Sequence, residues 1–157
     1  MPQKYTRTDI WREGKWLDLW SIVHLLSGLS LGLGFSFLPV GAFAAIALAF
    51  VLLVAYEMWE TIVRIEETPT NRFMDVVVGM VGFLPAFFLC APLLSAAHRI
   101  EVFAVMLVVD CVMSFFGWRA SQKAAALQKN LRARYVKERA RLMKQKTRLE
   151  ESFKHEE

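Results

Sequence analysis

The sequence lacks most of the short motifs by which catalytic sites are recognised. It has no Walker-type phosphate-binding loop, no HExxH pattern and no cysteine–histidine set at metal-ligand spacing. Its two cysteines, Cys90 and Cys111, lie in separate apolar stretches and lack the repeated spacing of a disulfide framework. These absences leave an enzyme unsupported, and the sequence predicts neither a structural disulfide nor a cofactor.

Apolar residues are abundant, and they are concentrated in four runs. They make up 55% of the 157 residues. Each run has roughly 17 to 20 residues, about the length a helix needs to cross the hydrocarbon core of a bilayer. Four such helices in so short a chain leave no polar surface to cover them. The sequence therefore predicts an all-α, polytopic membrane protein with four transmembrane helices, at about 19–38, 41–58, 76–94 and 102–118.

Basic residues near the ends of these runs predict the orientation. The first connection, around Pro39, has no Lys or Arg, and the third has only Arg99. The other side has Lys4, Arg7, Arg12, Lys15, Arg64 and Arg72. Both termini are therefore expected in the cytoplasm, with an aromatic belt at that boundary formed by Trp16, Trp20, Trp59 and Trp118.

The chain then divides into a cytoplasmic segment (1–18), a transmembrane domain (19–118) and a basic helical tail (119–157). From Arg119 onward, 12 Lys and Arg face 5 Asp and Glu, and the tail has neither proline nor glycine. Such a helix suits anionic lipid headgroups or a partner protein. A solvated extension that enforces the orientation explains it equally well. Nucleic-acid binding is not expected, because no aromatic-studded basic motif accompanies the charges.

Ionisable residues inside or at the edge of a membrane are the first candidates for function, because their burial is costly. Near the cytoplasmic boundary, His24 of the first helix, Glu57 and Glu60 of the second and Asp75 of the third are expected in one layer. Three carboxylates and an imidazole suit a divalent-metal site, an acid–base pair or a proton relay. The alternative is structural: the carboxylates are interfacial, Glu60 pairs with Arg64, and His24 is hydrogen-bonded within the bundle.

Several polar and small residues have structural explanations. Asn71 or Asp75 is placed to cap the third helix. Asp110, in the fourth run, is expected to be a hydrogen-bonded core residue bonded to Ser114 or a neighbouring helix, with a proton-handling role as the alternative. Gly28 and Gly32 form a small-residue pair that favours helix packing within the bundle over homodimerisation.

Over residues 18–89 the order of these residues resembles a known pattern. His24-x-x-x-Gly28, Tyr56-Glu57-x-x-Glu60 and Arg72-x-x-Asp75-x-x-x-Gly79-x-x-Gly82 are similar to the arrangement in VanZ-like and YjdF-type small membrane proteins. Glu60 stands where the VanZ-like pattern has Gln, and Gly79 where it has Asn. The resemblance implies a cell-envelope protein of the bacterial inner membrane with no settled reaction, and it points to the same four polar residues.

Two functions follow as hypotheses. In the first, the cytoplasm-side layer of His24, Glu57, Glu60 and Asp75 binds a lipid headgroup, a phosphate or an ion. In the second, the protein is a non-catalytic accessory subunit that docks into a larger membrane complex through its helices and tail. A channel is less well supported, since Asp110 alone gives no continuous polar path.

Overall fold

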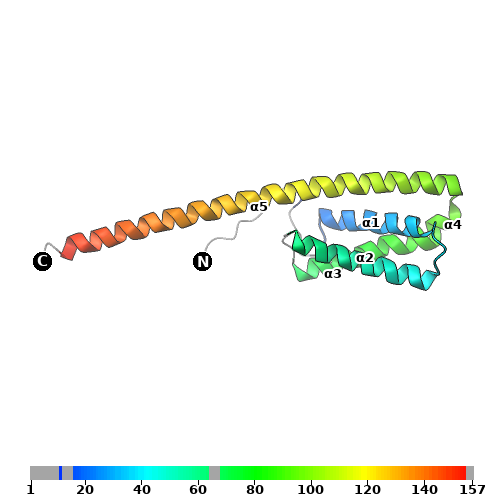
Figure 1. Cartoon of the computed structure of the whole chain (residues 1–157), viewed down its shortest axis with the longest axis horizontal. Helices are drawn as coiled ribbons and strands as arrows, with labels where there is room; N and C mark the ends of the chain where they lie inside the picture. Colours follow the sequence, from blue (N-terminus) through cyan, green and yellow to red (C-terminus); the bar gives the residue numbers. More distant parts are fainter. Residues whose placement is uncertain (1–10, 12–15, 64–67, 155–157) are drawn as a thin grey trace. The chain divides into compact units, whose positions relative to one another are not determined.

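The computed structural model describes residue 11, residues 16–63 and residues 68–154, with side chains up to residue 146. Every regular element in these ranges is a helix, which confirms the all-α prediction. In chain order the elements are α1 (Leu19–Phe35), α2 (Ala42–Ile62), α3 (Pro69–Pro85), the π-helical stretch η1 (Ala86–Cys90), α4 (Ala91–Leu93) and α5 (Ala96–Lys154) (Figure 1).

Three stretches are long and apolar enough to cross a membrane, judged by length and composition. They are α2, the continuous stretch Pro69–Leu93 formed by α3, η1 and α4, and Ala96–Lys146 of α5. α1 is also apolar but has only 17 residues. At about 1.5 Å per residue it is roughly 25 Å long, a few ångströms short of a typical hydrocarbon core.

The chain divides into two units, with the boundary in α5 between Ser121 and Gln122. The first contains α1 to α4 and the beginning of α5, and the second contains the rest of α5. The fourth apolar run and the basic tail were expected as separate segments, 102–118 and 119–157, but α5 continues through their junction as one helix. No proline or glycine follows Gly117, so the sequence offers no residue at which the helix would end.

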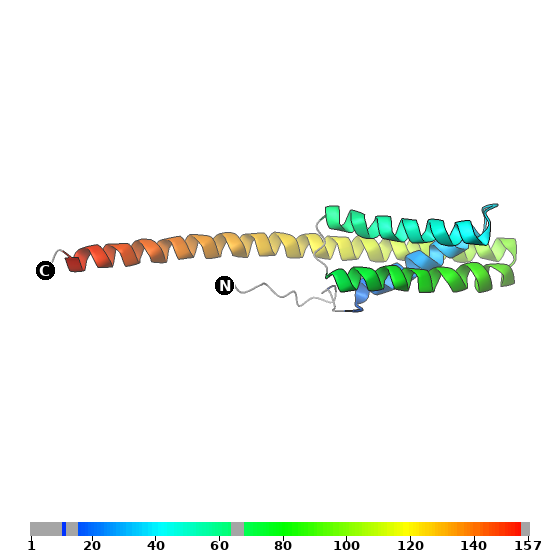
Figure 2. The same ribbon diagram turned by 90° about the horizontal axis from the view of Figure 1, so that it is seen from below.

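Close packing of α1 on α3 dominates the first unit, and α1 runs obliquely to α2 and α3 (Figure 2). A Cβ atom on Gly28 would collide with the backbone oxygen of Gly79, and one on Gly32 would lie 2.6 Å from the oxygen of Phe83. Gly82 of α3 faces the backbone of α1 in the same way. Small residues thus let two helix backbones approach closely, which is packing within the bundle.

The start of α3 differs from the prediction. The helix begins at Pro69 rather than near residue 76, and Thr68 is its N-cap, with the Thr68 hydroxyl accepting a hydrogen bond from the backbone N–H of Asn71. The expectation that Asn71 or Asp75 caps this helix is therefore wrong. A threonine followed by proline at the first helical position is a common helix start. Asp75 lies instead in the second turn and is fully buried.

Pro85 lies in the third apolar stretch, and a proline inside a helix commonly kinks it. α3 ends at Pro85 and continues directly as the π-helical η1. Proline removes one backbone donor and crowds the preceding turn, and local π-helical geometry is one way in which a helix accommodates this.

The aromatic belt is only partly as expected. Trp16, Trp59 and Trp118 are exposed. Trp20 is 1% exposed and packs edge-on against Trp11, with ring centroids 5.2 Å apart, so it belongs to the core and not to a belt. Of the basic residues that predict the orientation, Lys4, Arg7, Arg12, Lys15 and Arg64 lie outside the described residues, as does the expected Glu60–Arg64 pair.

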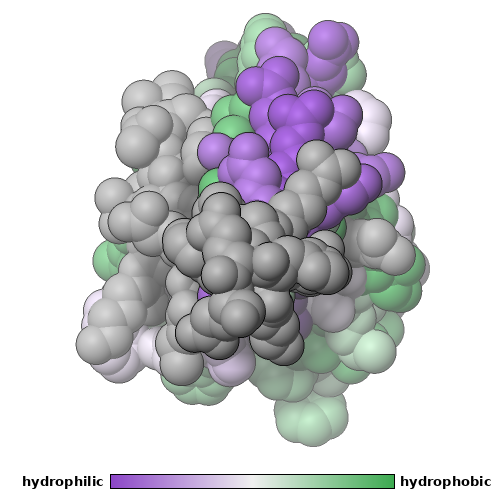
Figure 3. Space-filling view, turned by 90° about the vertical axis from the view of Figure 1, so that its left-hand side faces the viewer, coloured by the Kyte–Doolittle hydropathy of each residue, from purple (hydrophilic) through white to green (hydrophobic). Residues whose placement is uncertain are grey.

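The second unit is one extended helix. Between residues 122 and 146 nearly every side chain is exposed. Hydrophilic side chains gather in one region of the space-filling view (Figure 3). The tail therefore buries little apolar area by itself, and the prediction that it is helical is confirmed as far as Lys154.

Candidate functional site

The start of α1, the end of α2 and the start of α3 meet at one end of the first unit. Asp18 fixes the start of α1: its Oδ1 accepts hydrogen bonds from the backbone N–H groups of Trp20 and Ser21, and Ser21 Oγ accepts one from the N–H of Asp18. This capping box sets the register of α1. His24 lies one turn further along, on the side that faces the other helices.

His24 is the centre of the candidate site. Its Nε2 atom lies 3.3 Å from Oε1 of Glu57, 4.0 Å from Oε2 of Glu60 and 3.9 Å from Oδ2 of Asp75. The four residues come from three helices, and their side chains are between 0% and 7% exposed. The sequence predicted these four residues in one layer, and the structure brings them together.

A hydrogen-bond chain holds Asp75 in place. Ser21 Oγ of α1 donates to Asp75 Oδ1 at 2.7 Å, and Asn71 Nδ2 donates to Asp75 Oδ2 at 3.0 Å. Asn71 also donates to Asp18 Oδ2 at 3.2 Å. Asn71 therefore joins the cap of α1 to a carboxylate of the site, and it is fully buried. Partners of this kind orient the residues that contact a ligand.

Tyr56 forms one wall of the site. Its ring lies edge-on to the imidazole of His24, with centroids 5.3 Å apart, and it stacks on Trp59. Its hydroxyl interacts with the carboxylate of Glu60 and with Ser114 of α5. The aromatic ring limits the orientations open to the imidazole and excludes solvent from that side.

Sequence reasoning missed Asp18, Ser21 and Asn71 as parts of this site, and it cited Tyr56 only as part of a motif. Two local signals were present: the Asp-x-x-Ser spacing of a capping box, and the four-residue spacing of Asn71 and Asp75 along one helix face. Neither signal reveals that Asn71 contacts Asp18, 53 residues away in the sequence.

Asp110 is bonded elsewhere. Ser27 Oγ of α1 donates to Asp110 Oδ2 at 2.9 Å, so the expected bond to a neighbouring helix is confirmed.

Ser30 of α1 lies between Gly28 and Gly32 in a Gly-x-Ser-x-Gly run. That run is the interior of a helix and not a strand-to-helix turn, so it does not form a nucleophile elbow.

Ligand atoms of His24, Glu57 and Asp75 all lie within 4.8 Å of one another. Two donors bound at about 2.0–2.2 Å to one tetrahedral ion lie about 3.3–3.6 Å apart. The His24–Glu57 distance of 3.3 Å falls in this range, and the His24–Asp75 distance of 3.9 Å is slightly longer. Among the described residues, neither ring nitrogen of His24 has a hydrogen-bond partner, although the ring is 0% exposed. Burying an imidazole without hydrogen-bond partners costs free energy, and coordination of an ion by one ring nitrogen would offset that cost.

The charges of the site also favour a cation. Three buried carboxylates repel one another in a medium of low dielectric constant unless a cation or protons neutralise them. A phosphate placed directly among them would add to the repulsion. Of the ligand classes that the sequence left open, a cation fits this arrangement best.

Comparisons with known proteins identify no relative: no family model, no curated protein and no solved structure matches the chain. The resemblance to VanZ-like and YjdF-type proteins therefore stays a prediction, and the functional argument depends on the geometry of the site.

Proposed function

We propose that this chain is a four-span membrane protein, with both termini in the cytoplasm, that binds a divalent metal cation at His24, Glu57, Glu60 and Asp75. The convergence of buried donor atoms from three helices on His24 is the observation that supports it. One imidazole with several carboxylates suits ions such as Mn²⁺, Fe²⁺ and Zn²⁺ better than a soft thiolate-seeking metal. Such an ion supplies Lewis-acid chemistry.

α1 is the short span in this proposal. Although it is only 17 residues long, it packs closely on α3 and contributes His24 to the site. A short apolar helix is accommodated by local thinning of the bilayer or by its flanking residues. The even number of spans then puts both termini on the side where Lys and Arg are concentrated.

Reporter fusions test the orientation. A fluorescent reporter that matures only in the cytoplasm is fused after Glu157 or inserted after Pro39. Signal from the C-terminal fusion, and none from the insertion at Pro39, is expected. Signal from both positions would refute the four-span topology, because these positions would then lie on the same side.

Thermal unfolding tests the cation. The full chain is purified in mild detergent, treated with a chelator and titrated with Mn²⁺, Zn²⁺, Mg²⁺ or Na⁺. A specific ion at 100 times its dissociation constant adds about 2.7 kcal/mol to the free energy of unfolding, which raises the Tm. If the chelated protein is folded and monodisperse but none of the divalent ions raises its Tm, the proposed function is wrong.

One observation favours a second function, as an accessory subunit. Only 6% of the apolar stretch of α5 is buried within the chain, and Val105, Val108 and Phe116 are each more than half exposed. A partner helix could cover this face, and the exposed tail could bind the same partner. Extraction from native membranes in mild detergent, followed by mass measurement, tests this. A stable heteromeric complex supports the second function, and a lone chain argues against it.

A further inference from the structure

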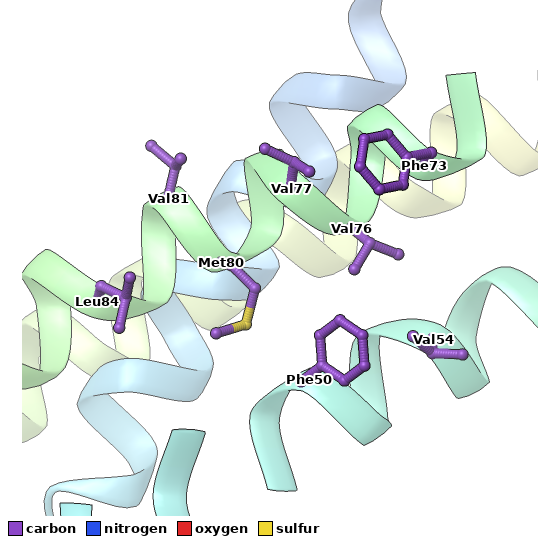
Figure 4. Close-up of a pocket in the computed structure, with 8 residues that line it drawn as sticks. All are labelled: Phe50, Val54, Phe73, Val76, Val77, Met80, Val81 and Leu84. Atoms are coloured by element: carbon purple, nitrogen blue, oxygen red, sulfur yellow. The ribbon is translucent and has the colours of Figure 1, made fainter. Parts of the chain in front are cut away.

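An apolar groove runs between α2 and α3 on the surface of the first unit. Phe50 and Val54 of α2 form one wall, and side chains of α3 that include Val76 and Met80 form the other (Figure 4). Its volume is about 320 Å³, and binding pockets for small ligands span roughly 300–1,000 Å³. Phe50 is 50% exposed, so the groove is accessible from outside the bundle.

The groove continues into a second cavity. Val54, Phe73 and Val76 line both cavities, and the second is also lined by Glu57, Thr61 and Arg72. Its volume is about 210 Å³. The charged side chain of Arg72 beside these apolar residues favours an amphiphilic ligand, with an apolar chain along α3 and a polar group at Arg72.

The charges and surroundings select the class of ligand. Arg72 carries a guanidinium group, whose planar fork of donors matches the oxygens of a phosphate. The apolar part lies along stretches long and apolar enough to cross a membrane, where acyl chains are the surrounding solvent. Glu57 is 6% exposed and also belongs to the cluster around His24, so the headgroup would lie next to that cluster.

We infer that the groove between α2 and α3 binds one glycerophospholipid, with an acyl chain against Phe50, Val76 and Met80 and its phosphate at Arg72. The inference rests on the proposed function only through Glu57, which the two sites share. Because the apolar groove and Arg72 are independent of the ion, each site can be tested while the other is disabled.

Photo-crosslinking is the test. The full chain is placed in phosphatidylcholine nanodiscs that contain a trace of phosphatidylglycerol with a diazirine on one acyl chain, and labelled residues are located by mass spectrometry. Labels are expected to concentrate on Phe50, Val54, Val76 and Met80. If labels instead follow exposure over all apolar helix faces, including Val105 and Val108 of α5, the lipid is only part of the surrounding bilayer and the inference is wrong.

The phosphate is tested separately. Arg72→Gln is expected to lower labelling of the groove roughly tenfold, since a charge-assisted contact is lost. Arg99→Gln is the matched control, because Arg99 is also half-buried and lies away from the groove, where it donates to the backbone oxygen of Ser36. A diazirine-labelled diacylglycerol, which has the same chains and no phosphate, is expected to label the groove as weakly as the Arg72 variant does. Equal labelling by both lipids would refute the assignment of the phosphate.

Two substitutions separate this inference from the proposed function. Val76→Trp fills the shared part of the groove and is expected to abolish groove labelling while metal binding persists; Val108→Trp on α5 is its control. His24→Ala is expected to abolish metal binding while groove labelling persists. Loss of labelling in the His24 variant, with folded protein, would contradict the independence of the two sites. Labelling of the unsubstituted chain decides the inference even if Val76→Trp does not fold.

Discussion

The Nε2 atom of His24 in α1 lies 3.3 Å from Oε1 of Glu57 in α2, and both side chains are buried. α1 packs much less on α2 than on α3, so this polar contact is one of the few links between the first two helices. A bundle of apolar helices gains little from polar contacts unless they are well satisfied. The pair therefore connects the first two helices, and in the proposed function it is also part of the metal site.

Replacing Gly28 by alanine is expected to destabilise the bundle. The added Cβ would overlap the backbone oxygen of Gly79, and backbone cannot move aside as a flexible side chain can. Overpacking of this kind costs about 1–3 kcal/mol. Thermal unfolding in detergent measures the effect. The matched control is Gly41→Ala, because nothing lies within 4 Å of a Cβ at Gly41. Equal Tm values for the two variants would contradict the close packing of α1 on α3.

Asn71→Ala is expected to weaken metal binding without removing a ligand. Asn71 Nδ2 donates to both Asp75 and Asp18, so its loss leaves the Asp75 carboxylate with the hydrogen bond from Ser21 and without the one to Oδ2. Loss of an outer partner of a metal ligand typically lowers affinity about 10–100-fold. Isothermal titration with the best-binding ion measures this. Asn130→Ala, in the exposed tail, is the control. Unchanged affinity in Asn71→Ala would show that Asp75 does not need its hydrogen bonds, or is not a ligand.

Asp110→Asn is expected to leave metal binding intact. Its carboxylate is bonded to Ser27 and is not one of the convergent ligand atoms. An amide oxygen accepts the same hydrogen bond, so the change in stability should be below about 1 kcal/mol. Metal content by elemental mass spectrometry and Tm together check this. Loss of the ion from a folded Asp110→Asn protein would show that Asp110 is a metal ligand and that the proposed ligand set is wrong.

Much of the site could be predicted from the sequence because the apolar runs determine how far each polar residue lies from the ends of its helix. Once the runs around His24, Glu57 and Asp75 are read as helices of alternating direction, these residues must lie at one level. Hydrogen bonds between helices depend instead on rotation and register, which the apolar pattern does not determine. This is why the role of Asn71 was missed, although Asn71 and Asp75 lie on one helix face.

The errors have a similar origin. Trp20 lies near the end of its apolar run, where the sequence predicts a residue of the aromatic belt. Its packing on Trp11 depends instead on which side of α1 faces inward. The predicted start of α3 was taken from the start of its apolar run. In the structure the N-cap Thr68 and Pro69 begin the helix seven residues earlier. A helical extension of the fourth run was one of the two explanations of the tail, and α5 is indeed continuous across the change from apolar to basic composition, because composition alone does not end a helix.

The most direct test of the cation site is the metal content of the chain purified from cells without chelator. The unsubstituted protein and His98→Ala are expected to retain about one divalent ion per chain, since His98 is exposed and bonded to Ser95 outside the site. His24→Ala is expected to lose the ion while it stays monodisperse in detergent, because the one imidazole ligand is gone. Equal metal content in the two histidine variants, or none in the unsubstituted protein even after addition of Mn²⁺ or Zn²⁺, would contradict a metal site at His24.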